Sequence, residues 1–133
     1  REELLFASML GGMVISHTGT TIVHGLGYSL TYFKGIPHGR ANGLLMKEYL
    51  RFNYDKAGDK TDKVLRLLGL GDIEEFGRLM DRLLAVNESF DPEELKLYAG
   101  LALKQKSASY NIKNVTQDDL FGILERSLLK KSL

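Results

Sequence analysis

The 133-residue sequence predicts an all-α domain of six or seven helices. Three observations support this fold class. Apolar residues recur at spacings of three and four, which is the period of one helix face, and helix-capping residues precede several of these stretches. No segment alternates apolar and polar residues in the way that an exposed strand does. A chain of this length can bury one hydrophobic core, so we expect a single domain over residues 1–133.

The first predicted helix covers residues 2–16, where apolar positions are dense. Three small residues within it, Ala7, Gly11 and Gly12, would let another helix approach closely. We therefore expect this helix to be buried at the centre of the core. It is too short to span a bilayer, and its acidic start is unlike a signal peptide. Because the chain starts with Arg1 rather than Met, we expect it to be the middle or end of a longer protein.

The second predicted helix covers residues 20–32 and contains Gly25 and Gly27. Glycine inside a helix lowers its stability, unless close packing or a ligand requires the missing side chain. A break at Gly35-Ile36-Pro37 follows, and Pro37 fixes the start of a third helix that begins near His38 and continues to about residue 52.

Capping pairs mark the remaining helices. In each pair a side chain that can accept from exposed amides is followed three positions later by an acidic residue: Asp72 with Glu75, Asp91 with Glu94, and Thr116 with Asp119. Three helices are expected after these pairs, and a shorter helix is expected around residues 62–68. No internal repeat or low-complexity segment is visible.

Composition restricts the partners and the kind of metal site. The chain has 18 basic and 17 acidic side chains, so no broad positive field would attract nucleic acid or an anionic membrane. We expect neither partner. Cysteine is absent, which excludes thiolate ligands and suits a reducing compartment, so we expect a cytoplasmic protein. Any bound metal must be held by histidine and carboxylate groups.

The three histidines lie within 22 consecutive residues, at His17, His24 and His38. His24 lies in the second predicted helix and His38 starts the third, with glycine and proline between them. If the chain reverses there, both rings can converge on one ion. Two imidazoles alone bind a metal weakly, so a stable site needs one or two further ligands. The alternative is a pair of hydrogen-bonded structural histidines.

The residues around this pair carry a specific pattern. Residues 7–53 resemble the second signature region of the iron-containing (group III) alcohol dehydrogenases. The resemblance rests on the interval between His24 and His38, on Pro37-His38-Gly39, and on Ala41-Asn42-Gly43 before an apolar helix. It continues more loosely to the end of the chain, where residues 116–125 are similar to the last helix of the family.

The resemblance implies a two-domain enzyme. Members have an N-terminal nucleotide-binding α/β domain and a C-terminal helical domain of the dehydroquinate synthase-like fold, with NAD(P) and one divalent metal, Fe²⁺ or Zn²⁺, in the cleft between them. The metal is held by an Asp and a His from an earlier helix and by two histidines that match His24 and His38. Neither that earlier helix nor a glycine-rich pyrophosphate loop occurs in this sequence, so no cofactor-binding residue is assigned. We expect the C-terminal metal-binding domain without its N-terminal partner, inactive in isolation.

The implied reaction is the interconversion of small alcohols with aldehydes or ketones by hydride transfer. Many members have a second histidine four positions after the first ligand, where this chain has Tyr28. Tyr28 is the candidate catalytic residue, although a phenol is a poorer proton relay than imidazole at neutral pH; pocket wall or core is the alternative. His17 stands where the family often has Asn. It could share the helix face of His24 if the helix ran through Gly19. The alternative is that His17 caps a helix end or lies at the surface.

Two other functions compete. Glycerol dehydrogenases and dehydroquinate synthases share the architecture, but their second ligand His-Gly is typically followed by Glu, whereas Arg40 follows here, which favours the alcohol dehydrogenase branch. A metal-free helical interaction module is the alternative from another class. The expected partners are the substrate and the protein's own N-terminal domain, and homo-oligomer formation through the uncovered interface stays open.

Overall fold

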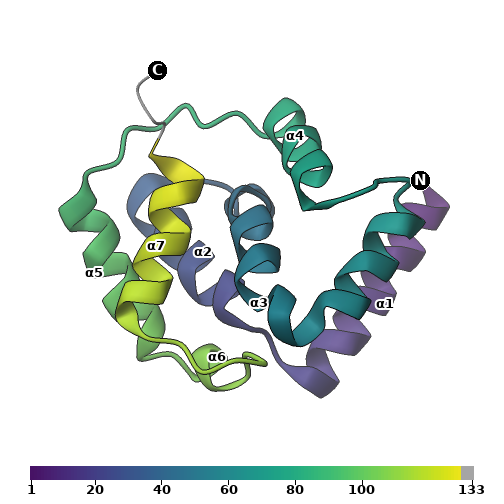
Figure 1. Ribbon diagram of the computed structural model, residues 1–133, viewed down its shortest axis with the longest axis horizontal. Helices are drawn as coiled ribbons and strands as arrows, with labels where there is room; N and C mark the ends of the chain where they lie inside the picture. The colour runs from purple at the N-terminus through teal and green to yellow at the C-terminus, as the bar shows by residue number, and fades with distance from the viewer. Residues whose placement is uncertain (130–133) are drawn as a thin grey trace.

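The computed structural model describes residues 1–129, which form seven α-helices and no β-strand (Figure 1). The all-α prediction of six or seven helices is confirmed. In chain order the helices are α1 (Glu2–Thr18), α2 (Ile22–Lys34), α3 (His38–Leu67), α4 (Ile73–Leu83), α5 (Pro92–Leu103), α6 (Lys106–Ser109) and α7 (Gln117–Leu128).

Helix α2 is the centre of the core. It packs against α3, α5, α6 and α7, and its side chains at Ile22, Leu26 and Leu30 are fully buried. Leu45 of α3 and Leu95 of α5 belong to the same apolar cluster and are also inaccessible to solvent. Burying a side chain of this size contributes about 1.5–3 kcal/mol. The core therefore holds α2 and α3, the two helices that carry the histidine pair, in fixed positions.

The predicted caps are confirmed. Asp72 accepts a hydrogen bond from the Glu75 amide at 2.7 Å at the start of α4. The pairs Asp91 with Glu94 and Thr116 with Asp119 form complete capping boxes before α5 and α7. These contacts satisfy amides that the helix itself leaves without partners.

The separate helix expected around residues 62–68 is instead the last part of α3. Ala57, with φ −134° and ψ 21°, is non-helical, and the helix bends there without ending. Gly69, with φ 72°, follows the end of this long helix. The two helical stretches expected from the sequence are therefore one helix with a bend.

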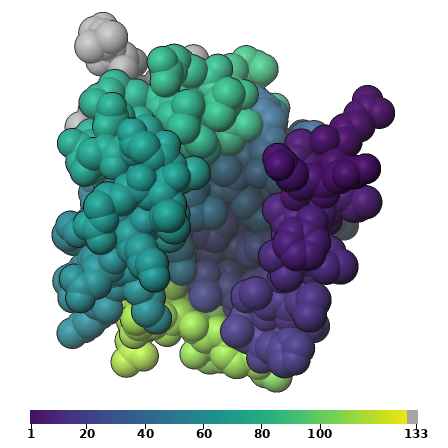
Figure 2. All heavy atoms as spheres, turned by 90° about the vertical axis from the view of Figure 1, so that its right-hand side faces the viewer, coloured from purple at the N-terminus to yellow at the C-terminus, as the bar shows by residue number. Residues whose placement is uncertain are grey.

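The expectation that α1 is a buried core helix is wrong. None of its residues is buried, and it packs against no other helix among the described residues. Figure 1 shows α1 behind the C-terminal half of α3, and Figure 2 shows a hollow between the two. Dense apolar residues indicate that a helix tends to be buried, but they do not say which part of a protein covers it. Of residues 1–129, no helix is long and apolar enough to cross a membrane.

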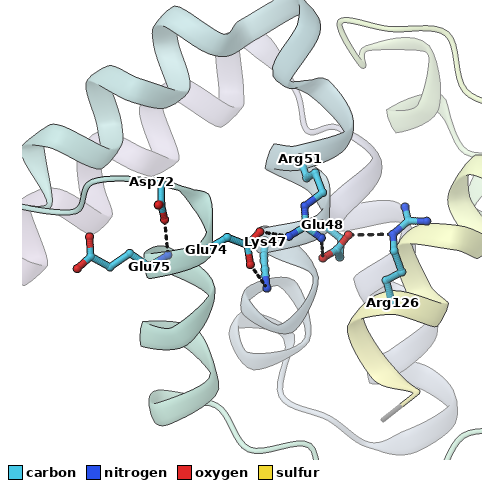
Figure 3. A network of polar contacts seen from close by, with 7 residues as sticks. All are labelled: Lys47, Glu48, Arg51, Asp72, Glu74, Glu75 and Arg126. Carbon is cyan, nitrogen blue, oxygen red and sulfur yellow. Dashed lines mark hydrogen bonds and ion pairs between the residues drawn. The ribbon is translucent and has the colours of Figure 1, made fainter. Parts of the chain in front are cut away.

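A network of ion pairs around one buried carboxylate joins α3, α4 and α7 on the side of α3 shown in Figure 3. The Glu48 side chain is 5% exposed and accepts hydrogen bonds from Arg51 and from Arg126 of α7. Glu74 of α4 pairs with both Lys47 and Arg51. The network anchors α4 and α7 to the helix that carries His38.

Candidate metal centre

The chain reverses between α2 and α3, and this reversal brings the two histidines together. Gly35 ends α2 in the left-handed conformation, with φ 67°, and Pro37 precedes the first residue of α3, His38. The His38 Nε2 atom lies 3.1 Å from His24 Nδ1, and the ring centroids are 5.0 Å apart. Residues fourteen positions apart in the sequence thus present ring nitrogens to each other, as the spacing predicted.

The separation of the nitrogens suits two ligands of one ion. Imidazole nitrogens bind a divalent metal such as zinc at about 2.0–2.1 Å, so two tetrahedral ligands lie roughly 3.3 Å apart. The observed 3.1 Å is close to that value. Within residues 1–129, no group of three or more His, Cys, Asp or Glu side chains is placed so that it could hold a metal ion. These residues fit part of a metal site, and the part they supply is two nitrogen donors.

Electrostatics favour the neutral form of the first histidine. Desolvation by burial lowers the pKa of His24, and the neighbouring charge of His38 lowers it further. A histidine must be neutral at the nitrogen that binds a metal. His24 therefore has a free nitrogen lone pair over a wider pH range than an exposed histidine.

Tyr28 lies one turn after His24, directly beside the pair. Its ring stacks on His38 with centroids 5.0 Å apart and planes 12° apart, and it meets His24 edge-on at 6.2 Å. The side chain is 47% exposed. Tyr28 is therefore part of the wall of the site and is not in the core.

His17 does not join the pair. Its Nδ1 atom lies 2.7 Å from the Met13 carbonyl oxygen within α1. Gly19, with φ 71°, ends α1 before α2 begins, so the unbroken helix that would align His17 with His24 does not form. The structure favours the surface role for His17.

Asn42 belongs to the site, but sequence reasoning gave it no role. Its Nδ2 atom lies 3.1 Å from His38 Nε2 and 3.5 Å from His24 Nδ1. It stands four positions after His38, and residues four apart share one face of a helix. That spacing is the signal that could have identified it.

Known proteins resemble this chain over most of its length. The profile of the Fe-containing alcohol dehydrogenase family, C-terminal, matches residues 1–128. An iron-containing alcohol dehydrogenase from Thermotoga maritima superposes on 92% of this chain and 33% of its own, with a TM-score of 0.79 and 31% identity.

The sequence relatives include two named aldehyde reductases. Lactaldehyde reductase of Escherichia coli (strain K12) is 35% identical over 69 residues, which cover 52% of this chain and 18% of the reductase. Sulfoacetaldehyde reductase of Bilophila wadsworthia (strain 3_1_6) is 28% identical over 100% of this chain and 33% of its own length. The chain thus spans a third or less of these relatives. It belongs to the Fe-containing alcohol dehydrogenase family and corresponds to the C-terminal part of that family.

Proposed function

We propose that this chain is the C-terminal metal-binding domain of an NAD(P)-dependent alcohol dehydrogenase that uses Fe²⁺ or Zn²⁺ and interconverts alcohols with aldehydes or ketones. The observation that carries the proposal is the 3.1 Å approach of His24 Nδ1 and His38 Nε2, at the two positions where the family resemblance implies ligands. Family membership and the reductase and dehydrogenase names of the relatives support it.

The metal site in this proposal is divided between two parts of a longer polypeptide. His24 and His38 supply two nitrogens, and the remaining ligands are an Asp and a His that precede these residues in the intact protein. NAD(P) binds to the N-terminal domain on the other side of the cleft. The isolated 133 residues therefore bind metal weakly and do not catalyse the reaction.

The chemistry follows from what these residues hold. A divalent cation, when bound, supplies Lewis-acid stabilisation of negative charge on the oxygen of the alcohol. The two imidazoles would hold this cation, and a nicotinamide cofactor would supply the hydride acceptor. Tyr28, whose ring stacks on His38 and which is 47% exposed, would donate a hydrogen bond to the substrate oxygen or relay the proton of the alcohol to solvent. We assign it as the catalytic residue of this chain.

The test is metal content in the intact parent protein. We expect His24→Ala and His38→Ala each to lose the bound metal and the dehydrogenase activity, because each removes one nitrogen donor. His17→Ala is the matched control, because its ring lies outside the site. Circular dichroism of the 133-residue chain should show that helix content survives each change. Full metal content and activity in either site variant would remove the ligand assignment.

A further inference from the structure

Helix α1 is apolar on every side and has no neighbouring helix among residues 1–129. It carries no charged side chain from Leu4 to Ser16, and none of its residues is buried. It packs against no other helix of the described chain. A helix that is apolar all round is ordinarily covered by other polypeptide. The surface of α1 therefore fits an interface whose other side lies outside these residues.

Two glycines in the middle of α1 have no explanation within the described chain. Gly11 and Gly12 lie where glycine is the least favourable residue after proline. A Cβ atom added at either position would meet nothing within 4 Å. Glycine in such a place is expected where another backbone approaches closely. No backbone of the described residues does so here.

A hollow beside α1 has a second apolar border. Figure 2 shows this hollow between α1 and the C-terminal half of α3. Val64, Leu67 and Leu68 lie three and four positions apart, so they share one face at the end of α3. Their exposed fractions are 51%, 78% and 54%. The helix on the other side of the hollow therefore also carries uncovered apolar side chains.

The family match indicates which polypeptide covers these surfaces. Residues 1–128 correspond to the C-terminal part of the family, and the chain covers 33% of the Thermotoga maritima protein. In a parent of that length, most of the additional polypeptide precedes residue 1, and α1 begins at Glu2. Apolar walls offer no hydrogen-bond partners, so a segment between them must pair its own backbone groups, as a helix does.

We propose that a helical segment of the polypeptide that precedes residue 1 in the intact parent fills this hollow. Its apolar side chains pack on α1 and on the exposed face at the end of α3, and its backbone approaches α1 closely at Gly11 and Gly12. The proposal rests on the proposed function in one respect, namely that the chain is the C-terminal part of a longer protein. It does not depend on the metal or on the reaction.

Hydrogen exchange followed by mass spectrometry tests the covering segment in unaltered proteins. We compare the 133-residue chain, at a concentration where sedimentation shows a monomer, with the intact parent after metal removal. The amides of α1 should exchange at least about tenfold faster in the 133-residue chain, because a helix without packing partners opens readily. Helix α5 is the internal control, because Leu95 and Ala99 are buried within the described residues, and it should be protected equally in both proteins.

Two results of this comparison would overturn the proposal. The first is exchange of α1 at the same rate in the parent and in the 133-residue chain. The second is protection of α1 that disappears when the parent is diluted to a monomer, because the covering surface would then belong to a second copy.

Alanine at the two glycines tests the close approach. In the monomeric 133-residue chain, the double change Gly11→Ala with Gly12→Ala should raise the helix content measured by circular dichroism, because alanine favours a helix and both positions have open space. In the intact parent the same double change should lower the Tm by several degrees, because the new methyl groups meet the covering backbone.

Gly58→Ala on α3 is the matched control. Its new Cβ would lie 3.5 Å from atoms of the Tyr54 ring, which is an ordinary contact, so it should lower the Tm of neither protein. A double variant that folds as the 133-residue chain but not as the parent has the same meaning as a lowered Tm. A parent whose Tm is unchanged or raised by the double change would overturn the close approach at Gly11 and Gly12.

These results are separate from the metal assay. If the intact parent binds no metal but protects α1, the proposed function fails and the covering segment stands. If the parent binds metal and leaves α1 unprotected, the reverse holds.

Discussion

At the scale of single residues, Tyr28 stands where the family resemblance implies a histidine in many members. Its ring lies flat on His38 and is 47% exposed. We propose two roles for it: the ring shields one face of the His38 imidazole, and the hydroxyl takes part in proton transfer.

Replacing Tyr28 by Phe separates these two roles. Phenylalanine keeps the stacked ring and removes only the hydroxyl, so we expect the intact parent to keep its metal while kcat falls at least about tenfold. Tyr32→Phe, one turn further along α2 and 83% exposed, is the control that should leave kcat unchanged. Metal content and steady-state kinetics of the two variants check these expectations. An unchanged kcat in Tyr28→Phe would leave Tyr28 as pocket wall alone.

The convergence of His24 and His38 could be predicted because it depends on local signals, namely two helix positions and a glycine and proline break. The approach of Asn42 to the pair and to Gly27 could not, because both depend on how the faces of α2 and α3 fit together. The sequence indicated that a glycine in mid-helix costs stability unless close packing or a ligand needs it, but it did not identify the neighbours. In the structure, a Cβ atom at Gly25 would meet Ser107 and one at Gly27 would meet Asn42.

At the scale of elements, an ion pair ties the start of α3 to the segment between α4 and α5. Arg40 donates to both carboxylate oxygens of Glu88 and also to the Ala85 carbonyl oxygen. The Arg40 hydrogen bond lowers the pKa of Glu88 to about 2, from an ordinary value of 4.5. A carboxyl whose pKa is lower in the folded state stabilises that state when it is ionised.

This contact should make stability depend on pH in a defined range. Glu88 contributes fully above about pH 4.5, and its contribution disappears as the pH falls toward 2. We expect Glu88→Gln to lower the free energy of unfolding at pH 7 by about 0.5–1 kcal/mol, the usual size for a partly exposed pair. Urea denaturation at pH 7 and near pH 2 measures the difference between variant and parent. A difference that persists at the lower pH would contradict this assignment.

The helix boundaries show how local signals succeed and fail. Capping pairs at Asp72, Asp91 and Thr116 located three helix starts, because a cap is a contact between residues three apart. The end of α3 was misplaced because the stretches expected at about 38–52 and 62–68 are parts of one helix that bends at Ala57. The burial of α1 was mispredicted because burial is a property of the surroundings of a helix.

At the scale of the whole molecule, α1 is the helix whose apolar side chains stay exposed to solvent. Eight large apolar side chains along it are between 43% and 76% exposed: Leu4, Leu5, Phe6, Met9, Leu10, Met13, Val14 and Ile15. They surround the helix, and a helix that is apolar on every side is ordinarily buried. The related proteins are about three times as long as this chain, so their additional polypeptide is available to cover such a helix.

We expect the isolated chain to self-associate through α1, because contact between copies would remove this apolar surface from water. Leu5 and Met9 lie one turn apart on a helix that packs against no other helix of residues 1–129. The double change Leu5→Lys with Met9→Lys should therefore weaken association without unfolding the core. Leu97→Lys with Leu101→Lys, an exposed pair at the same spacing on α5, is the matched control and should leave association intact. Sedimentation equilibrium over a concentration series measures the association of the parent chain and of both double variants. A monomeric parent chain, or equal weakening by the two double changes, would show that α1 is not the associating surface.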